Sequence, residues 1–128
     1  MTAQEIIPYL GLPWVFGQRD CWCFFRELSK KYYNRDVPAV DVDLHNLRDI
    51  MQKIDREKKA HWIQIKEPID GCAVLMQRNK MPVHIGMWLE NDGGKVLHCA
   101  QGIGVVFQRL QDLKFDGWSQ FTYWELKD

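Results

Sequence analysis

The order of two periodicities along the chain is the feature that most constrains its fold. Up to about residue 59, apolar side chains recur every three or four residues, which is the spacing of one helix face. After Pro68, short runs rich in β-branched and aromatic residues alternate with turn residues, a pattern typical of strands. Helices followed by strands predict an α+β fold, with N-terminal helices packed on a mainly antiparallel β-sheet.

Local signals predict the individual elements. Helices are expected over residues 3–10, 20–33 and 43–59, and strands over residues 72–77, 83–90, 94–99, 104–108 and 121–124. The second helix has the clearest start, because Asp20 is a good N-cap residue. Its apolar positions, among them Cys21, Phe24 and Leu28, fall on one face. That face is therefore expected to pack on the sheet.

One hairpin also predicts a register. The loop Asn91-Asp92-Gly93 matches a three-residue connection with glycine in the left-handed position. Such a loop pairs His98 with Gly86, which places His98 on the same face of the sheet as His84. A four-residue loop would send His98 to the opposite face.

Size and charge exclude several classes of protein. The chain has 128 residues, so we expect residues 1–128 to form a single domain. Its 17 basic and 17 acidic residues cancel, which argues against binding to nucleic acid or an anionic membrane by charge. No apolar stretch approaches the roughly 18 residues of a membrane span. The first residues lack the pattern of a secretion signal, so we expect synthesis in the cytoplasm.

The four cysteines are expected to be reduced thiols. Cys21 and Cys23 lie two residues apart, where helix side chains diverge, and no secretion signal suggests an oxidising destination. A metal site is the competing interpretation, since Cys99, His84 and His98 would add three further ligands. The spacing of these residues lacks the C-x₂-C or H-x₃-H pattern of a structural zinc site, so we expect no metal.

Cys21 is the most informative single position. At the first position of a helix, unpaired backbone N–H groups and the positive end of the dipole favour the thiolate. We therefore expect a lowered pKa for this thiol, which shares a helix face with Phe24 and points toward the sheet. A buried and inert cysteine is the alternative that position alone leaves open.

The strands supply a base for this thiol. Alternation places His84 and Gly86 on one face of their strand, and the glycine is expected to leave open space in front of the histidine. With His98 on the same face, Cys21, His84 and His98 form a nucleophile, a base and a group that orients the base. That arrangement follows the logic of acyl-transfer hydrolysis.

Three segments together fit the pattern of a known family. They are Asp20-Cys21 at the start of a helix, the strand His84-Ile85-Gly86-Met87-Trp88-Leu89, and His98 at the end of the next strand. The approach Gly11-Leu12-Pro13-Trp14-Val15-Phe16-Gly17 also matches. With these segments the chain resembles the NlpC-type cell-wall peptidases, which are papain-like cysteine enzymes that cut peptide bonds in bacterial peptidoglycan.

The resemblance implies a mechanism and a role for each residue. Cys21 is the nucleophile, His84 the base and His98 the orienting group, and no metal or organic cofactor takes part. The thiolate attacks a peptide carbonyl and forms an acyl-enzyme, which water hydrolyses. Backbone N–H groups at the helix start, including that of Cys21, bind the oxyanion. Trp14 stands where the family usually has a tyrosine, and we expect Trp14 and Trp22 to line the substrate cleft.

The resemblance also implies partners. Asp20-Cys21-Trp22 is similar to compact versions of the family that are encoded with bacteriophage tail genes. The expected substrate is the stem peptide of peptidoglycan, the expected partners are phage tail proteins, and the expected final location is the virion tail. The alternative from another class is a catalytically silent tail-assembly or interaction protein that retains the fold.

Overall fold

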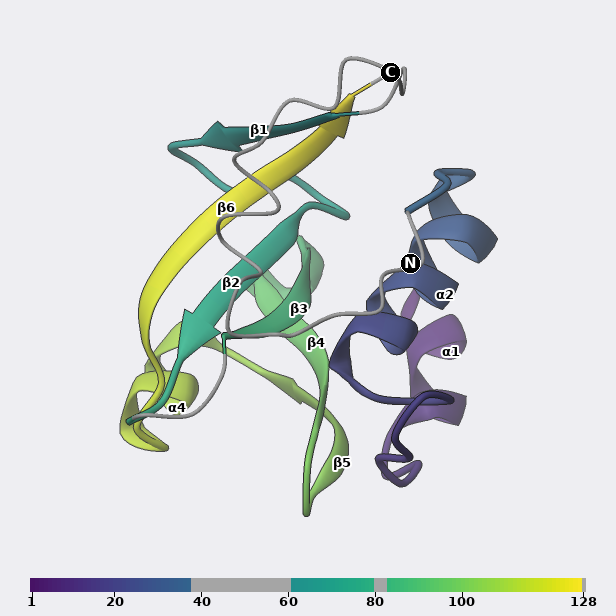
Figure 1. Cartoon of the computed structure of the whole chain (residues 1–128), viewed down its shortest axis with the longest axis vertical. Coiled ribbons are helices and arrows are strands. Elements are labelled where there is room, and N and C mark those ends of the chain that lie inside the picture. Colours follow the sequence, from purple (N-terminus) through teal and green to yellow (C-terminus); the bar gives the residue numbers. More distant parts are fainter. Residues whose placement is uncertain (38–60, 80–82, 128) are drawn as a thin grey trace.

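Short helices precede an antiparallel sheet, so the predicted α+β fold with N-terminal helices is confirmed (Figure 1). The structure is a computed structural model that describes residues 1–37, 61–79 and 83–127. Its helices are α1 (Ala3–Ile6), the 3₁₀ turns η1 (Ile7–Tyr9) and η3 (Asn91–Gly93), α2 (Cys21–Tyr33) and α4 (Leu110–Phe115). Its strands are β1 (His61–Ile65), β2 (Ala73–Gln77), β3 (His84–Leu89), β4 (Lys95–Ala100), β5 (Gly104–Gln108) and β6 (Ser119–Lys127).

The sheet has the strand order β1-β6-β2-β3-β4-β5, and every neighbouring pair is antiparallel. The last strand therefore inserts between β1 and β2, while β2 to β5 follow in chain order. Five of these strands were expected from the sequence, whereas β1 and α4 were not. The predicted helix over residues 43–59 lies outside the described residues.

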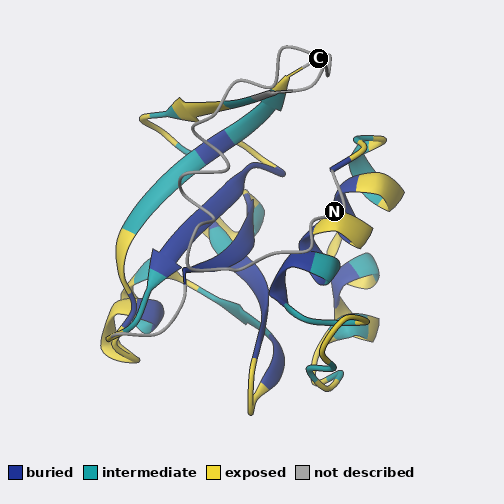
Figure 2. Cartoon of the chain, viewed as in Figure 1, coloured by how far each residue is buried: buried dark blue, intermediate teal, exposed yellow. Residues whose placement is uncertain are grey.

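Each face of the sheet has its own apolar cluster. On one face, α2 contributes Phe24, Phe25 and Leu28, which pack with β-strand residues such as Ile85. On the other face, Leu113 of α4 joins Trp118 and residues of the central strands. Burial of the central strands between these layers is visible in Figure 2. The sheet is thus covered on both sides, and groups on its two faces are separated by the backbone of the strands.

Local chemistry fixes where α2 begins. The Asp20 side chain accepts a hydrogen bond from the Cys23 N–H at 2.8 Å, as expected of an N-cap residue. The loop before the helix is tied to β4, because the Cys99 thiol donates to the Arg19 carbonyl at 3.2 Å. These contacts place Cys21 at the helix start and hold that start against β4.

The predicted register of the β3–β4 hairpin is confirmed. Met87 pairs with Leu97 and Leu89 pairs with Lys95, which is the alignment expected from a three-residue loop. Gly93 has a φ of +84°, in the left-handed region that favours glycine. This register determines which face of β4 carries its histidine.

One expectation about this hairpin is wrong. The space in front of Gly86 is not open, since a Cβ atom there would lie 2.5 Å from Val96 Cγ1 and 3.0 Å from His98 Cβ. Glycine at this position instead allows the side chains of β4 to pack closely over β3. The absence of a side chain at Gly86 thus permits close packing between β3 and β4.

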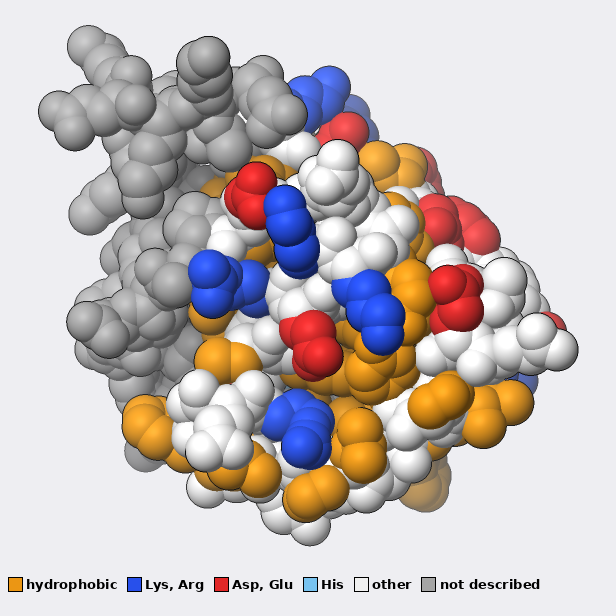
Figure 3. Space-filling view, turned by 90° about the vertical axis from the view of Figure 1, so that its right-hand side faces the viewer, with side chains coloured by type: hydrophobic (Ala, Val, Ile, Leu, Met, Phe, Trp, Pro, Cys, Tyr) orange, Lys and Arg blue, Asp and Glu red, His pale blue; other side chains and the backbone are white. Residues whose placement is uncertain are grey.

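The surface on the helix side carries both signs of charge. Figure 3 shows Lys and Arg side chains interspersed with Asp and Glu over the face that includes α1 and α2. One ion pair on this side joins Lys30 to Asp36 at 2.9 Å. Within the described parts of the chain, no helix has the length and apolar character needed to cross a membrane.

Candidate active site

Cys21 is the first residue of α2, and its side chain faces the sheet as the helix periodicity predicts. The side chain is 4% exposed and belongs to the apolar cluster between α2 and the strands. Ile85 of β3 belongs to the same cluster. Because Ile85 directly follows His84 in β3, the fold brings the thiol to the strand that carries the expected base.

The expectation of a lowered thiol pKa is wrong. Burial raises the pKa of Cys21 to about 11, and it outweighs the backbone hydrogen bonds from Ile85 and Trp22 that lower the pKa. The nearby carboxylate of Asp20 raises the pKa further. The N-cap that starts the helix thus also opposes ionisation of the thiol, which is protonated at neutral pH.

His84 and His98 lie in direct contact, as the hairpin register predicts. Nε2 of His84 is 2.9 Å from Nδ1 of His98, and both side chains are buried. Trp118 shields this pair, since its ring stacks on His84 with a centroid distance of 4.8 Å and meets His98 edge-on at 6.3 Å. The contact between the expected base and its orienting group is therefore present.

The hydrogen-bonded chain continues beyond the two histidines. Nε2 of His98 is 2.9 Å from Oε1 of Gln108, at the end of β5. Nε2 of Gln108 donates to Oδ2 of Asp116 at 2.9 Å, immediately after α4. Neither residue was expected from the sequence. The signal was incomplete, because the strand ending at Gln108 was predicted but its register with β4 was not.

Both imidazoles are neutral at neutral pH. Burial, followed by the charges of His98 and Arg78, lowers the pKa of His84 well below its ordinary value. Burial lowers the pKa of His98 to about 4, although the Gln108 hydrogen bond opposes this shift. A neutral imidazole keeps one unprotonated ring nitrogen, and such a nitrogen accepts a proton in general-base catalysis.

The thiol and the histidine pair approach β3 from different sides. His84 pairs with Met76 and stacks on Trp118, both of which belong to the cluster on the α4 face. Cys21 packs with Ile85 in the cluster on the α2 face. Among the described side chains, the His84 ring bonds to His98, and no hydrogen bond joins it to the Cys21 thiol. Contact between nucleophile and base therefore stays a prediction.

The two tryptophans expected to contact substrate occupy different environments. Trp22 is 4% exposed, and its ring lies 6.5 Å from that of Trp62 in the core. Trp14 is partly exposed, and its ring lies 6.3 Å from that of Phe16, which is itself largely exposed. Trp14 thus presents surface beside the approach to α2, whereas Trp22 presents little. Their roles in substrate binding stay predictions.

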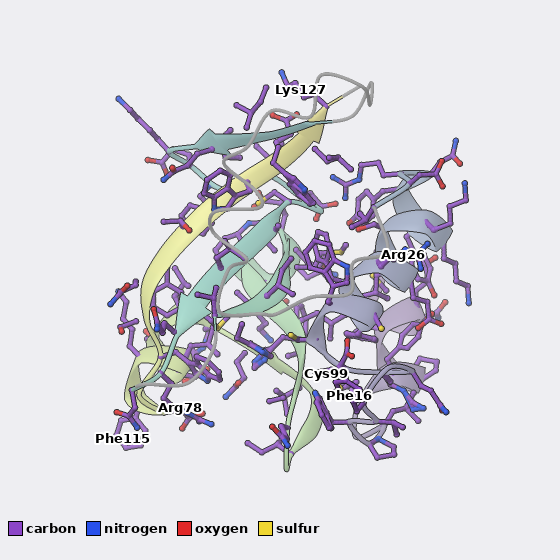
Figure 4. All side chains as sticks on the ribbon, in the orientation of Figure 1. Phe16, Arg26, Arg78, Cys99, Phe115 and Lys127 are labelled. Carbon is purple, nitrogen blue, oxygen red and sulfur yellow. The ribbon has the colours of Figure 1, made fainter. Side chains whose placement is uncertain are left out.

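A cavity of about 280 Å³ lies beside the histidine pair on the α4 side. Its lining includes His98, Gln108, Asp116 and Trp118, together with Arg78, whose guanidinium lies 4.5 Å from the Trp118 ring centroid. Arg78 stands on the side of the sheet away from α2 (Figure 4). Gln108 and Asp116, at the far end of the hydrogen-bonded chain, therefore lie in the wall of this cavity.

A larger groove of about 820 Å³ follows the outer face of α2 and is lined by Cys23 but not by Cys21. The groove is therefore separate from the Cys21 thiol.

All four cysteines are free thiols. Within the described residues, no three His, Cys, Asp or Glu side chains are grouped as a metal ion would require.

Two comparisons with known proteins find no match to this chain. A scan against protein-family models finds no matching family, and a search of curated proteins finds no match to the chain. The resemblance to NlpC-type peptidases therefore depends on the residues of this chain alone.

Proposed function

We propose that this protein is a cysteine endopeptidase of the NlpC type that hydrolyses peptide bonds in bacterial peptidoglycan. Cys21 is the nucleophile, His84 the general base and His98 the group that orients the base. The observation that carries the proposal is the buried 2.9 Å contact between the two histidines, on the strand whose Ile85 belongs to the same apolar cluster as Cys21. A thiol at a helix start and an imidazole oriented by a second group are the two components that acyl transfer by a cysteine enzyme requires.

The protonation states favour general-base attack over a resting thiolate–imidazolium pair. With a thiol pKa of about 11 and a neutral imidazole, the proton leaves Cys21 as its sulfur bonds to the substrate carbonyl carbon. His84 takes that proton and passes it to the departing amine, which leaves a thioester on Cys21. His84 then removes a proton from water, and the resulting attack releases the acid and restores the thiol.

The start of α2 is the proposed site for the oxyanion. Negative charge on the carbonyl oxygen is stabilised near backbone N–H groups at the positive end of a helix. The Cys23 N–H already donates to Asp20, so it does not serve this purpose. The Cys21 N–H, two residues earlier in the chain, is the group we assign to the oxyanion.

The proposed setting is a phage tail that delivers the enzyme to the cell wall. The stem peptide of peptidoglycan is the substrate, and tail proteins are the partners. Support for this setting comes from the likeness of Asp20-Cys21-Trp22 to tail-encoded versions of the family.

Release of soluble muropeptides from purified peptidoglycan tests the proposal. The wild type and Cys23→Ala are expected to release fragments, because the Cys23 thiol faces the groove outside α2. Cys21→Ala is expected to release none, and His84→Ala is expected to be slower by about 10²–10⁴-fold, the usual contribution of a general base. Undiminished release by Cys21→Ala would contradict the assignment.

A catalytically silent assembly protein is the second candidate. The 4% exposure of the Cys21 side chain favours it, as does the absence of a described hydrogen bond between that thiol and His84. This candidate predicts a folded protein that releases no fragments from any peptidoglycan type but co-purifies with tail particles. Fragment release that depends on Cys21 would exclude it.

A further inference from the structure

Three hydrogen bonds in series connect His84 to a carboxylate at the surface. They join His84 to His98, His98 to Gln108 and Gln108 to Asp116, each with a heavy-atom distance of 2.9 Å. The series starts on β3, crosses β4 and β5, and ends just after α4. His84 and His98 are buried, whereas Asp116 is exposed. The exposed end is therefore open to substitution without disturbing the core.

The carboxylate determines the direction of every hydrogen bond in the series. An ionised carboxylate only accepts, so Gln108 presents its NH₂ group to Asp116 and its oxygen to His98. The oxygen of Gln108 accepts, so Nε2 of His98 carries a proton. In a neutral imidazole the other nitrogen is then unprotonated, and Nδ1 of His98 accepts a proton donated by Nε2 of His84. This leaves the lone pair of His84 on Nδ1.

We propose that Gln108 and Asp116 are positioning residues that fix the tautomer of His84, so that Nδ1 is its basic nitrogen. The tautomer depends only on the hydrogen bonds above, whereas its catalytic consequence rests on the proposed function. Among the described residues, Trp118 and Arg78 also face the pair, and neither competes for this role. Trp118 packs against both rings, and its indole N–H only donates. Arg78 is a cation and likewise only donates.

Reversal of the charge at the end of the series gives the sharpest test. In Asp116→Lys, the ammonium group donates to the Gln108 oxygen, so the Gln108 NH₂ group turns to His98. Nε2 of His98 then accepts, its Nδ1 donates to Nε2 of His84, and the proton of His84 moves to Nδ1. The matched control is Asp112→Lys, since Asp112 is also on α4 but bonds to Arg109 outside the series.

Nitrogen chemical shifts of the imidazole rings measure the tautomer directly. Long-range ¹H–¹⁵N spectra at pH 8, assigned with His84→Gln and His98→Gln, are expected to show protonated Nε2 on both rings in the wild type and Asp112→Lys. In Asp116→Lys, both rings are expected to carry the proton on Nδ1. Wild-type His84 protonated on Nδ1, or an Asp116→Lys spectrum with the wild-type tautomers, would overturn the proposal. Asp116→Asn and Gln108→Leu provide independent variants, and both are expected to yield mixed tautomers.

Fragment release separates this inference from the proposed function. If the enzyme is active, Asp116→Lys is expected to lower kcat by about tenfold or more with little change in KM, as groups that orient a histidine do. Unchanged kcat in a variant with the reversed tautomer would contradict a positioning role. A protein with the expected tautomers and no activity would refute the proposed function while leaving the tautomer assignment intact.

Discussion

At the scale of single residues, burial outweighs position in setting the chemistry of Cys21. A helix start stabilises a negative charge by about 0.3–1 kcal/mol at exposed sites. Removal of a thiolate from water acts in the opposite direction, and in this protein it prevails, since burial is the largest contribution to the raised pKa of Cys21. The helix start could be predicted from the sequence. The burial of the thiol could not, because the residues that bury it lie on strands far away in the chain.

This balance predicts the order in which the cysteines react. A pKa of about 11 leaves about one Cys21 thiol in 10⁴ ionised at pH 7. Alkylation by iodoacetamide, followed by peptide mass spectrometry, is expected to label the partly exposed Cys23 before the buried Cys21 at pH 7. Labelling of Cys21 is expected to rise about tenfold per pH unit up to pH 10. Selective labelling of Cys21 near pH 6 would contradict the raised pKa and would show that the protein stabilises the Cys21 thiolate.

At the scale of elements, the parts with local signals could be predicted. Asp20 determines the start of α2, and Asn91-Asp92-Gly93 determines the register that brings His84 to His98. β1 and α4 lack such signals, because both are short and owe their place to packing. The hydrogen bonds of Gln108 and Asp116 depend on where α4 packs on the sheet. These two members of the four-residue series therefore could not be predicted from the sequence.

The close packing of β3 and β4 makes a prediction about Gly86. In Gly86→Ala the new methyl group would lie 2.5 Å from Val96 Cγ1, and such overpacking costs about 1–3 kcal/mol in the free energy of unfolding. Urea denaturation measures this cost. In a Val96→Ala background the same substitution is expected to cost less, because the opposing methyl groups are gone. Equal costs in both backgrounds would contradict the packing argument.

At the scale of the whole molecule, the sheet separates the parts of the proposed site. α2 brings the thiol to one face, while α4, Trp118 and the Gln108–Asp116 pair support the histidines from the other. β3 is the strand common to both parts, since its His84 lies on the α4 side and its Ile85 lies on the α2 side. The site thus depends on the assembled sheet and on no single element.

The buried histidines also make global stability depend on pH. Folding lowers the pKa of both His84 and His98, the latter from 6.5 to about 4. The contribution of His98 to stability is complete above pH 6.5 and is lost as the pH falls toward 4, because over that range only the unfolded chain binds the extra proton. The contribution of His84 likewise decreases as the pH falls below 6.5. The loss approaches about 1.4 kcal/mol per pH unit for each histidine. Arg78 and Asp116 face the pair and act on it in opposite directions.

Thermal unfolding between pH 7.5 and 4.5 measures this dependence. The wild type is expected to lose melting temperature more steeply than His98→Asn, which lacks one of the titrating groups. Carboxylates titrate in both proteins, so the difference between the two curves isolates the histidine. Parallel curves would mean that protonation of His98 does not oppose folding.

The most direct measurement of the central claim is the covalent intermediate on Cys21. Reactions with solubilised peptidoglycan peptides are quenched in acid during the first turnovers and are analysed by intact-mass and peptide mass spectrometry. We predict a mass increase equal to the acyl fragment on the peptide that contains Cys21, absent in Cys21→Ala. Product formed while Cys21 stays unmodified, an adduct on another cysteine, or neither product nor adduct would contradict the account.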